Sequence, residues 1–263
     1  MVCNLKIGFF DSGIGGLTVL HQALKWLPAE DYLFYADSAH VPYGEKPKDE
    51  VRQYIEEAVR FIFAQGAEAL VIACNTATSI AVQELRRQYS FPILGIEPAV
   101  KPAVLQVEGT PKKVLVLATQ LTLQEDKYHN LVKRLDSRDI VDSLALPGLV
   151  RLAEAFDFSE ECVQSCLQEQ FAGLDLCKYG TVVLGCTHFP YFIPALRKLF
   201  PRETQFISGN AGTARNLQHI LEQRFPLGRG SGNIEYYTSG TRVEDAALLS
   251  QYTGLLQMLD SIQ

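Results

Sequence analysis

Residues 69–78 read ALVIACNTAT, and the apolar run that ends at Cys74 predicts a buried β-strand followed at once by a helix. Residues 181–190, TVVLGCTHFP, repeat this arrangement, since a second apolar run ends at Cys186 and is again followed by threonine within two residues. A cysteine where a strand meets a helix faces free amide groups and the positive end of the helix dipole, and both favour a thiolate. Two such thiols from separate parts of one chain suggest a pair that acts on one substrate from opposite sides.

The sequence around both stretches alternates between strand and helix. In the first half we expect strands at residues 6–10, 31–37, 69–74 and 92–96, and helices at 17–27, 48–65 and 76–88. In the second half we expect strands at 113–119, 140–146, 181–186, 205–209 and 234–240, and helices at 125–135, 146–156, 159–174, 190–200, 211–224 and the C-terminus. This order predicts parallel sheets with helices on both faces.

The spacing of the strand ends indicates two similar halves. The interval from Asp11, at the end of the first strand, to Cys74 is nearly the same as the interval from Thr119, at the end of the strand VLVLAT, to Cys186. Ligands of open α/β sheets bind beyond the carboxyl ends of the strands, so a substrate in a cleft between the halves would meet both thiols. The sequence therefore predicts an α/β protein of two similar domains, each with a mainly parallel sheet flanked by helices, and an active site in the cleft between them.

The composition sets limits on the class of protein. Of the 263 residues, 47% are hydrophobic and 21% are charged, which is enough for a sizeable core and argues against disorder. The formal charge of −6 gives no electrostatic reason to expect nucleic acid or an anionic membrane as a partner. The opening residues lack the pattern of a signal peptide, and no apolar stretch reaches the roughly 20 residues of a membrane-spanning helix. We therefore expect a cytoplasmic protein whose six cysteines are thiols.

The residues after each cysteine suit the binding of an acidic ligand. Asn75 and Thr76 are good helix N-cap residues, and their side chains with the free amides of a first turn can hold a carboxylate. Thr187 and His188 precede Pro190, which is favoured in the first turn of a helix. Both cysteines are thus followed by polar residues, which a buried structural cysteine does not require.

The cysteines allow two other interpretations. One buried cysteine is more often structural than catalytic, but two in matching polar turns favour a functional pair. Cys74, Cys186 and His188 could also supply three ligands to zinc, although no paired CxxC or HxxxH pattern accompanies them. The sequence favours thiol chemistry without a metal.

Two turns contribute further candidates. The turn DSGIGG lacks the spacing of a dinucleotide fingerprint, yet it places Asp11 and Ser12 at the end of a strand that faces the expected cleft. An aspartate at such a place is more often a turn residue than an acid or base. In VPYGEK, the turn at Tyr43 and Gly44 offers backbone amides that could hold an anion.

Five motifs together resemble those of glutamate racemases. They are FFDSGIGGLTVL, YADSAHVPYGEK, VIACNTATS, GIEPAVKPA and LGCTHFPYF, and they follow the order and spacing of that family from the N-terminus to the segment after Cys186. The resemblance implies an isomerase that interconverts L- and D-glutamate without pyridoxal phosphate or any other cofactor. It also implies that the D-isomer supplies bacterial peptidoglycan synthesis, and hence the cell wall and cell shape.

The resemblance also implies a role for each site residue. One cysteine acts as thiolate base and the other as thiol acid, and Cys74 and Cys186 match those positions; a free thiol has a pKa of about 8.5 and needs activation. Asp11 matches the helper of the first thiol, His188 that of the second, and Glu154 a carboxylate that assists the histidine. The matching substrate-binding positions are Asp11, Ser12, Tyr43, Gly44, Asn75, Thr76, Thr119, Thr122, Thr187 and His188.

The family fold implies that the chain returns to its first domain at the end. We therefore expect one domain at residues 1–97 plus 208–263 and the other at 98–207. The sequence departs from the family pattern at Leu121 and Glu125, where a small residue and a serine are usual, and at Ser208 and Gly209, where Asp-Ser is usual. We expect Leu121 to narrow the substrate pocket and the Glu125 carboxylate to disfavour an anionic ligand.

These departures leave alternatives open. One is a racemase of aspartate or another amino acid, and another is a regulatory binding protein of low activity. The second is suggested by family members that regulate DNA gyrase, although the net negative charge argues against direct DNA binding. Family analogy also suggests a homodimer.

Overall fold

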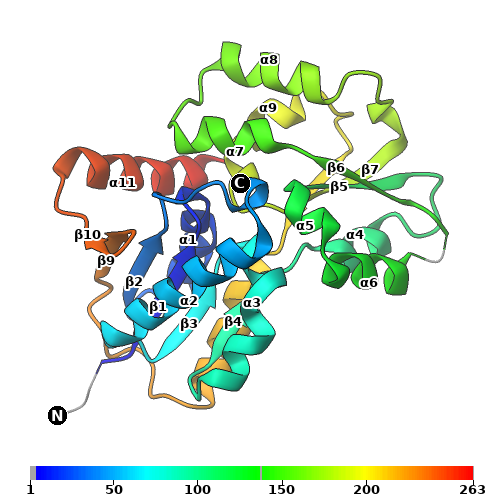
Figure 1. Cartoon of the computed structure of the whole chain (residues 1–263). Helices are drawn as coiled ribbons and strands as arrows, with labels where there is room; N and C mark the ends of the chain where they lie inside the picture. The colour runs from blue at the N-terminus through cyan, green and yellow to red at the C-terminus, as the bar shows by residue number, and fades with distance from the viewer. Residues whose placement is uncertain (1–3, 137, 263) are drawn as a thin grey trace.

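The computed structural model describes residues 4–136 and 138–262, and in this part of the chain ten strands form two sheets. The first sheet has the order β10-β9-β2-β1-β3-β4 and the second the order β6-β5-β7-β8 (Figure 1). The strands of the first are β1 (Lys6–Asp11), β2 (Asp31–Ala36), β3 (Ala69–Ile72), β4 (Ile93–Gly95), β9 (Ile234–Thr238) and β10 (Thr241–Arg242). Those of the second are β5 (Lys113–Ala118), β6 (Val141–Ala145), β7 (Tyr179–Leu184) and β8 (Gln205–Ser208). All pairs are parallel except β9 with β10.

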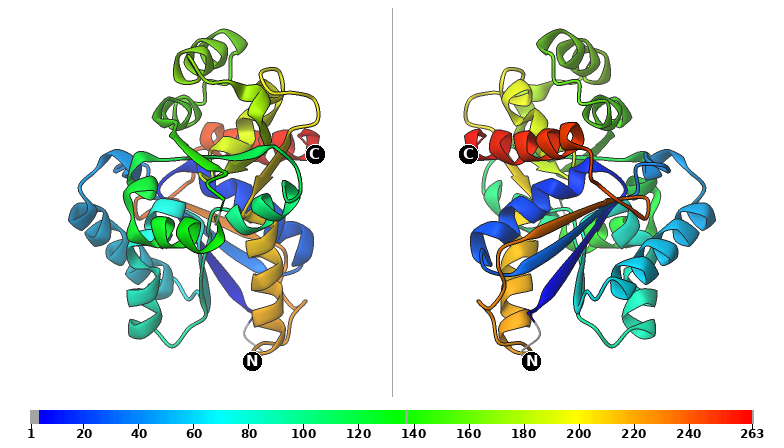
Figure 2. Two further views of the ribbon diagram at one scale, coloured as in Figure 1. Left: turned by 90° about the vertical axis from the view of Figure 1, so that its right-hand side faces the viewer. Right: turned by 90° about the vertical axis from the view of Figure 1, so that its left-hand side faces the viewer.

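Helices cover both faces of the first sheet because its strands are apolar on both sides. Along β1, Phe9 belongs to one buried cluster and Phe10 to another, as expected for side chains that alternate across a strand. On the first face lie α1 (Leu17–Trp26), α10 (Asn210–Glu222) and α11 (Ala246–Ser261), and on the second α2 (Lys48–Ala64) and α3 (Asn75–Gln88). Figure 2 shows α10 beside α1, although the two helices come from distant parts of the sequence.

The second sheet is smaller and is likewise covered by helices. They are α4 (Val100–Gln106), α5 (Gln120–Gln124), α6 (Asp126–Leu135), α7 (Pro147–Glu154), α8 (Glu160–Gln170) and α9 (Ile193–Arg197). The expected fold class is confirmed. No helix among residues 4–136 and 138–262 is long and apolar enough to cross a membrane.

One predicted helix differs in a way that matters for the site. We expected a continuous helix over residues 190–200, but a 3₁₀ turn, η4 (Phe189–Phe192), is followed by the five-residue α9. Pro190 and Pro194 each stand at the start of one of these segments, where a missing N–H costs nothing, and each prevents a longer helix from running through it. Two short helices, α4 and α5, had not been predicted at all.

The chain returns to the first sheet after β8, because β9 pairs with β2 and α10 packs on α1. The strands of the first sheet fall within residues 1–97 and 208–263, and β8 ends at Ser208, next to the expected boundary. The exact domain limits stay a prediction, and residues 1–3 and 263 lie outside the described part of the chain.

Candidate active site

The carboxyl ends of β1, β3, β5 and β7 surround a small buried cavity, which we call the thiol cavity. Its volume is about 20 Å³, and both Cys74 and Cys186 line it. The cavity therefore brings together the ends of strands from both sheets, as the strand-end argument predicted. Its lining residues are Ser12, Pro42, Tyr43, Gly44, Cys74, Asn75, Thr76, Thr119, Val150, Gly185, Cys186, Thr187 and His188.

Cys74 lies at the start of α3, as predicted, but it is itself the N-cap residue, whereas the sequence indicated Asn75 and Thr76 for that role. Its Sγ accepts a hydrogen bond from the amide of Ala77 at 3.4 Å and donates to the Ser12 hydroxyl at 3.8 Å. Burial raises the pKa of the Cys74 thiol well above its usual value, and the nearby Asp11 carboxylate raises it further, so the helix N-terminus is outweighed. These surroundings favour the neutral thiol at Cys74.

Cys186 has a different environment from the one predicted. The strand β7 ends at Leu184 and η4 begins at Phe189, so Cys186 lies in a turn and not at the N-terminus of a helix. Its Sγ lies 3.4 Å from His188 Nδ1 instead. The polar group beside the Cys186 thiol is thus a histidine two residues away.

His188 connects Cys186 to a carboxylate from another helix. Its Nε2 lies 2.5 Å from Oε1 of Glu154, the last residue of α7, and the same oxygen accepts the amide of Ile14 at 2.8 Å. Burial opposes the charged imidazolium, but Cys186 and Glu154 together outweigh it and raise the pKa of His188 well above its usual value. An imidazolium at His188 donates to both neighbours.

Asp11 is buried beside this group without lining the cavity. The amide of Gly16 donates to its Oδ2 at 2.6 Å, while its Oδ1 has no hydrogen-bond partner among the described residues. Burial raises the pKa of Asp11 to about 7, and the Glu154 carboxylate also raises it while His188 lowers it. A carboxyl group with this pKa can give or take a proton near neutrality.

The remaining walls carry neutral polar groups. The hydroxyls of Thr76, Thr119 and Thr122 lie 2.9–3.0 Å from one another, which links α3 of the first sheet to α5 of the second. The Oδ1 atom of Asn75 is buried without a partner among the described residues. The Tyr43 hydroxyl donates to the buried Asp37 at 2.6 Å, which fixes the turn that carries Gly44. Of the predicted binding residues, Thr122 and Asp11 do not line the thiol cavity.

Known proteins resemble this chain along almost its whole length. A family profile described as Asp/Glu/Hydantoin racemase matches residues 16–217. The chain belongs to this family. Glutamate racemase 2 of Bacillus subtilis is 55% identical over 259 residues, which cover 98% of each chain. Glutamate racemase of Halothermothrix orenii is 53% identical over 96% of this chain and 99% of its own.

Solved structures of racemases share the fold. The glutamate racemase of Escherichia coli, in complex with L-glutamate and the activator UDP-MurNAc-ala, matches with a TM-score of 0.83 at 28% identity, over 98% of this chain and 96% of its own. The racemase from Campylobacter jejuni matches with a TM-score of 0.77 at 28% identity, over 96% and 98%. The present chain is thus a racemase, an enzyme of the isomerase class.

Two departures from the family pattern, Leu121 and Glu125, do not line the thiol cavity. Leu121 packs against a buried apolar cluster that includes residues of α2 and α3. Glu125 lines a second, larger pocket. The Glu125 carboxylate lies 2.7 Å from the Lys48 ammonium, so its charge is paired, and its expected effect on an anionic ligand stays a prediction. The sequence could not indicate this pair, because Lys48 lies 77 residues away.

Thr18 positions this site, although nothing in the sequence pattern indicates it. The hydroxyl oxygen of Thr18 lies 2.8 Å from the carbonyl of Gly15 and 2.9 Å from that of Thr187, and it accepts a hydrogen bond from Asn210 at 2.8 Å. Thr18 therefore joins the glycine-rich turn to the segment that carries Cys186. Its place on an amphipathic helix gives no sequence signal, and Asn210 follows 192 residues later.

Proposed function

We propose that this protein interconverts L- and D-glutamate without a cofactor, with Cys74 and Cys186 as the two acid–base groups. Racemisation requires that the α-proton leave one face of the substrate and that another proton be returned to the opposite face. The observation that carries the proposal is one cavity lined by two free thiols, one from each side of the site. The names of the relatives support glutamate as the substrate.

The surroundings of the two thiols support distinct starting states. An imidazolium at His188 stabilises a thiolate at Cys186, while burial keeps the proton on Cys74. In one direction Cys186 then removes the α-proton and Cys74 donates a proton to the opposite face. In the opposite direction the two thiols exchange roles, with Asp11 as the acid–base helper of Cys74 and Glu154 holding His188.

The walls of the thiol cavity suit two carboxylates and one ammonium group. Ser12, Thr76, Thr119 and Thr187, with backbone amides such as that of Gly44, can donate to carboxylates, and the free Oδ1 of Asn75 can accept from the ammonium. The walls must separate to admit a substrate, since the cavity measures only about 20 Å³. Closure then excludes water and strengthens each polar contact.

The test is isotope incorporation during racemisation. Purified protein incubated with L-glutamate in D₂O, without added cofactor, should lose circular dichroism while deuterium enters at the α-carbon. Cys74→Ser and Cys186→Ser should each abolish racemisation. Full activity in either variant would refute the two-thiol mechanism. Faster turnover of L-aspartate than of L-glutamate would show that aspartate is the preferred substrate.

The cellular role follows from the same proposal. D-Glutamate made in the cytoplasm would supply peptidoglycan synthesis, and the complex of the Escherichia coli racemase with UDP-MurNAc-ala supports this setting. The division at residues 1–97 plus 208–263 and 98–207 would let two domains part to admit the substrate. A homodimer and a gyrase interaction are suggested by family analogy alone.

A further inference from the structure

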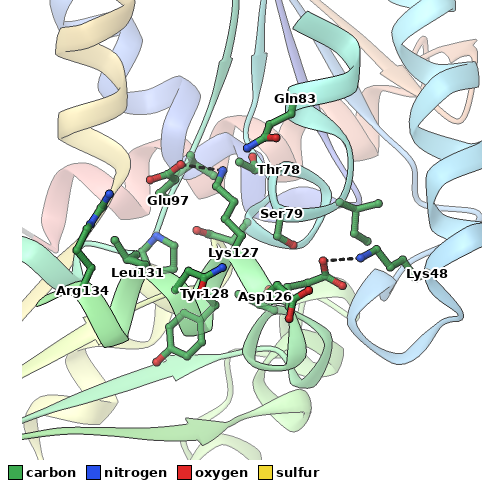
Figure 3. A pocket seen from close by; sticks show the side chains of 17 residues that line it. Lys48, Thr78, Ser79, Gln83, Glu97, Asp126, Lys127, Tyr128, Leu131 and Arg134 are labelled. Atoms are coloured by element: carbon green, nitrogen blue, oxygen red, sulfur yellow. Dashed lines mark hydrogen bonds and ion pairs between the residues drawn. The ribbon is translucent and has the colours of Figure 1, made fainter. Parts of the chain in front are cut away.

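A second, larger hollow adjoins the thiol cavity, and we call it the outer pocket. Its volume is about 660 Å³, and it lies between α3 on one side and α5 and α6 on the other (Figure 3). Asn75 lines both hollows. Thr122 lines the outer pocket, and its hydroxyl bonds to Thr76 and Thr119, which line the thiol cavity. The outer pocket therefore leads to the wall behind which the substrate must bind.

The two hollows differ in charge. Among the residues that line the thiol cavity, His188 is the one basic side chain. The outer pocket is lined by Lys48, Lys127 and Arg134 together with the carboxylates Glu97, Glu125 and Asp126. Lys127 lies 2.7 Å from Glu97, at the side of the pocket away from Lys48 (Figure 3). The outer pocket thus contains lysine and arginine side chains that the thiol cavity lacks, and both lysines are paired with carboxylates of the same pocket.

Lys48 is the cation on the side of the outer pocket next to α2. It is the first residue of α2, and its ammonium group is paired with Glu125, which lies just after α5. The side chain of Lys48 is 44% exposed, but that of Glu125 is only 9% exposed. The largely buried Glu125 carboxylate therefore pairs with a Lys48 ammonium group that is accessible from the outer pocket.

We propose that Lys48 is a specificity-determining residue that attracts a carboxylate of the incoming acidic substrate, and that Glu125 competes with the substrate for it. This inference rests on the proposed function for the identity of the substrate. A protein of net charge −6 repels an anionic substrate at long range, so a local cation on the path to the site increases its capture. When the substrate carboxylate displaces the Glu125 carboxylate, Lys48 exchanges one carboxylate partner for another and is never left unpaired.

A simpler role for the pair would be to tie the two sides of the site together. A second ion pair in the chain makes it possible to distinguish this structural role from substrate capture. Arg151 of α7 binds Glu45 through two contacts of 3.1 and 2.8 Å, and Glu45 lies only three residues before Lys48. This second pair also joins the Tyr43–Glu45 turn to the second sheet, but neither of its residues lines the outer pocket. Glu45→Gln is therefore a control for the loss of an ion pair that connects the two sides of the site.

The experiment compares five proteins: wild type, Lys48→Met, Glu125→Gln, the double variant and Glu45→Gln. For each, KM and kcat for L-glutamate are measured at low and high salt. The dissociation constant of L-glutamate is measured by calorimetry in a background of Cys74→Ser and Cys186→Ser.

The two roles predict opposite signs for Glu125→Gln. If Lys48 captures the substrate, Lys48→Met raises KM and the dissociation constant about three- to tenfold at low salt, a range reasonable for one partly exposed charge. Glu125→Gln lowers both about two- to fivefold, the double variant matches Lys48→Met, and Glu45→Gln changes neither. High salt reduces all these differences.

Three results would overturn the inference. One is a rise in KM in both single variants with recovery in the double variant, and another is equal effects of Glu125→Gln and Glu45→Gln. The third is a dissociation constant that does not change across the five proteins. If the wild type does not racemise glutamate but the dissociation constants follow the expected order, the proposed function fails while Lys48 keeps its role.

Discussion

Glu154→Gln tests whether the carboxylate behind His188 assists catalysis by its charge. The Glu154 oxygen accepts hydrogen bonds from His188 and from the amide of Ile14, and its side chain is 14% exposed. A hydrogen bond to a charged group contributes about 1.5–3 kcal/mol, and about 1.4 kcal/mol corresponds to tenfold in rate. The neutral amide keeps the shape but loses the charge. We therefore expect kcat/KM to fall about 10- to 100-fold.

The same variant should change the pH profile. Glu154 is one of the groups that raise the pKa of His188, so its loss moves that pKa down toward the ordinary value. The alkaline limb of kcat/KM against pH should then move to lower pH. Racemisation is followed by circular dichroism from each enantiomer, and kcat/KM must fall equally in both directions because enantiomers have equal free energies.

A matched control distinguishes catalysis from stability. Glu30 is another buried carboxylate, 1% exposed, and it accepts the amide of Gly228 away from the thiol cavity. Glu30→Gln should destabilise the fold while leaving kcat/KM unchanged. A fall of less than threefold in Glu154→Gln without a shift of the alkaline limb would refute the role of the charge, as would equal losses in both variants.

Two further substitutions test neighbouring parts of the site. The pKa of Asp11 is about 7 in the folded chain and about 3.8 as a free side chain, so the unfolding free energy should fall by up to about 4 kcal/mol between pH 4 and 8. Asp11→Asn should flatten this slope in urea unfolding, and an unchanged slope would show that another group causes it. A Cβ added at Gly13 would lie 1.9 Å from a Glu154 carboxylate oxygen, so Gly13→Ala should displace Glu154 and lower kcat/KM about as much as Glu154→Gln does. Gly212→Ala, whose Cβ meets nothing within 4 Å, is its control, and equal activity of the two variants would contradict the reasoning.

Much of the fold could be predicted because hydrophobic periodicity is a local signal. The strands that precede Cys74 and Cys186 are short apolar runs, and each was predicted within two residues of its end. The helix expected after Cys186 failed because two prolines divide residues 189–197 into short segments. Periodicity alone does not account for this kind of interruption.

The site was less predictable because its groups depend on tertiary contacts. The sequence could place Cys74 at the start of a helix, but the contact of Cys186 with His188, which a glutamate 34 residues earlier holds, depends on the tertiary structure. Glu154 was indicated by family resemblance alone. Likewise Glu125, considered by itself, looked like an unfavourable charge, and its partner Lys48 became evident only in three dimensions.

The different helpers of the two thiols bear on how the enzyme returns to its starting state. Under the proposed mechanism, a turnover that begins with the Cys186 thiolate ends with the proton on Cys186 and a thiolate at Cys74. That product state is disfavoured, because burial and the Asp11 carboxylate both raise the pKa of Cys74. Asp11 itself has a pKa of about 7, so a protonated Asp11 removes one of these unfavourable charges and can resupply Cys74 with a proton. Asp11 should therefore govern the return of a proton to Cys74 and His188 the proton transfers at Cys186. Both groups contribute to one pH profile of kcat/KM that is the same in both directions.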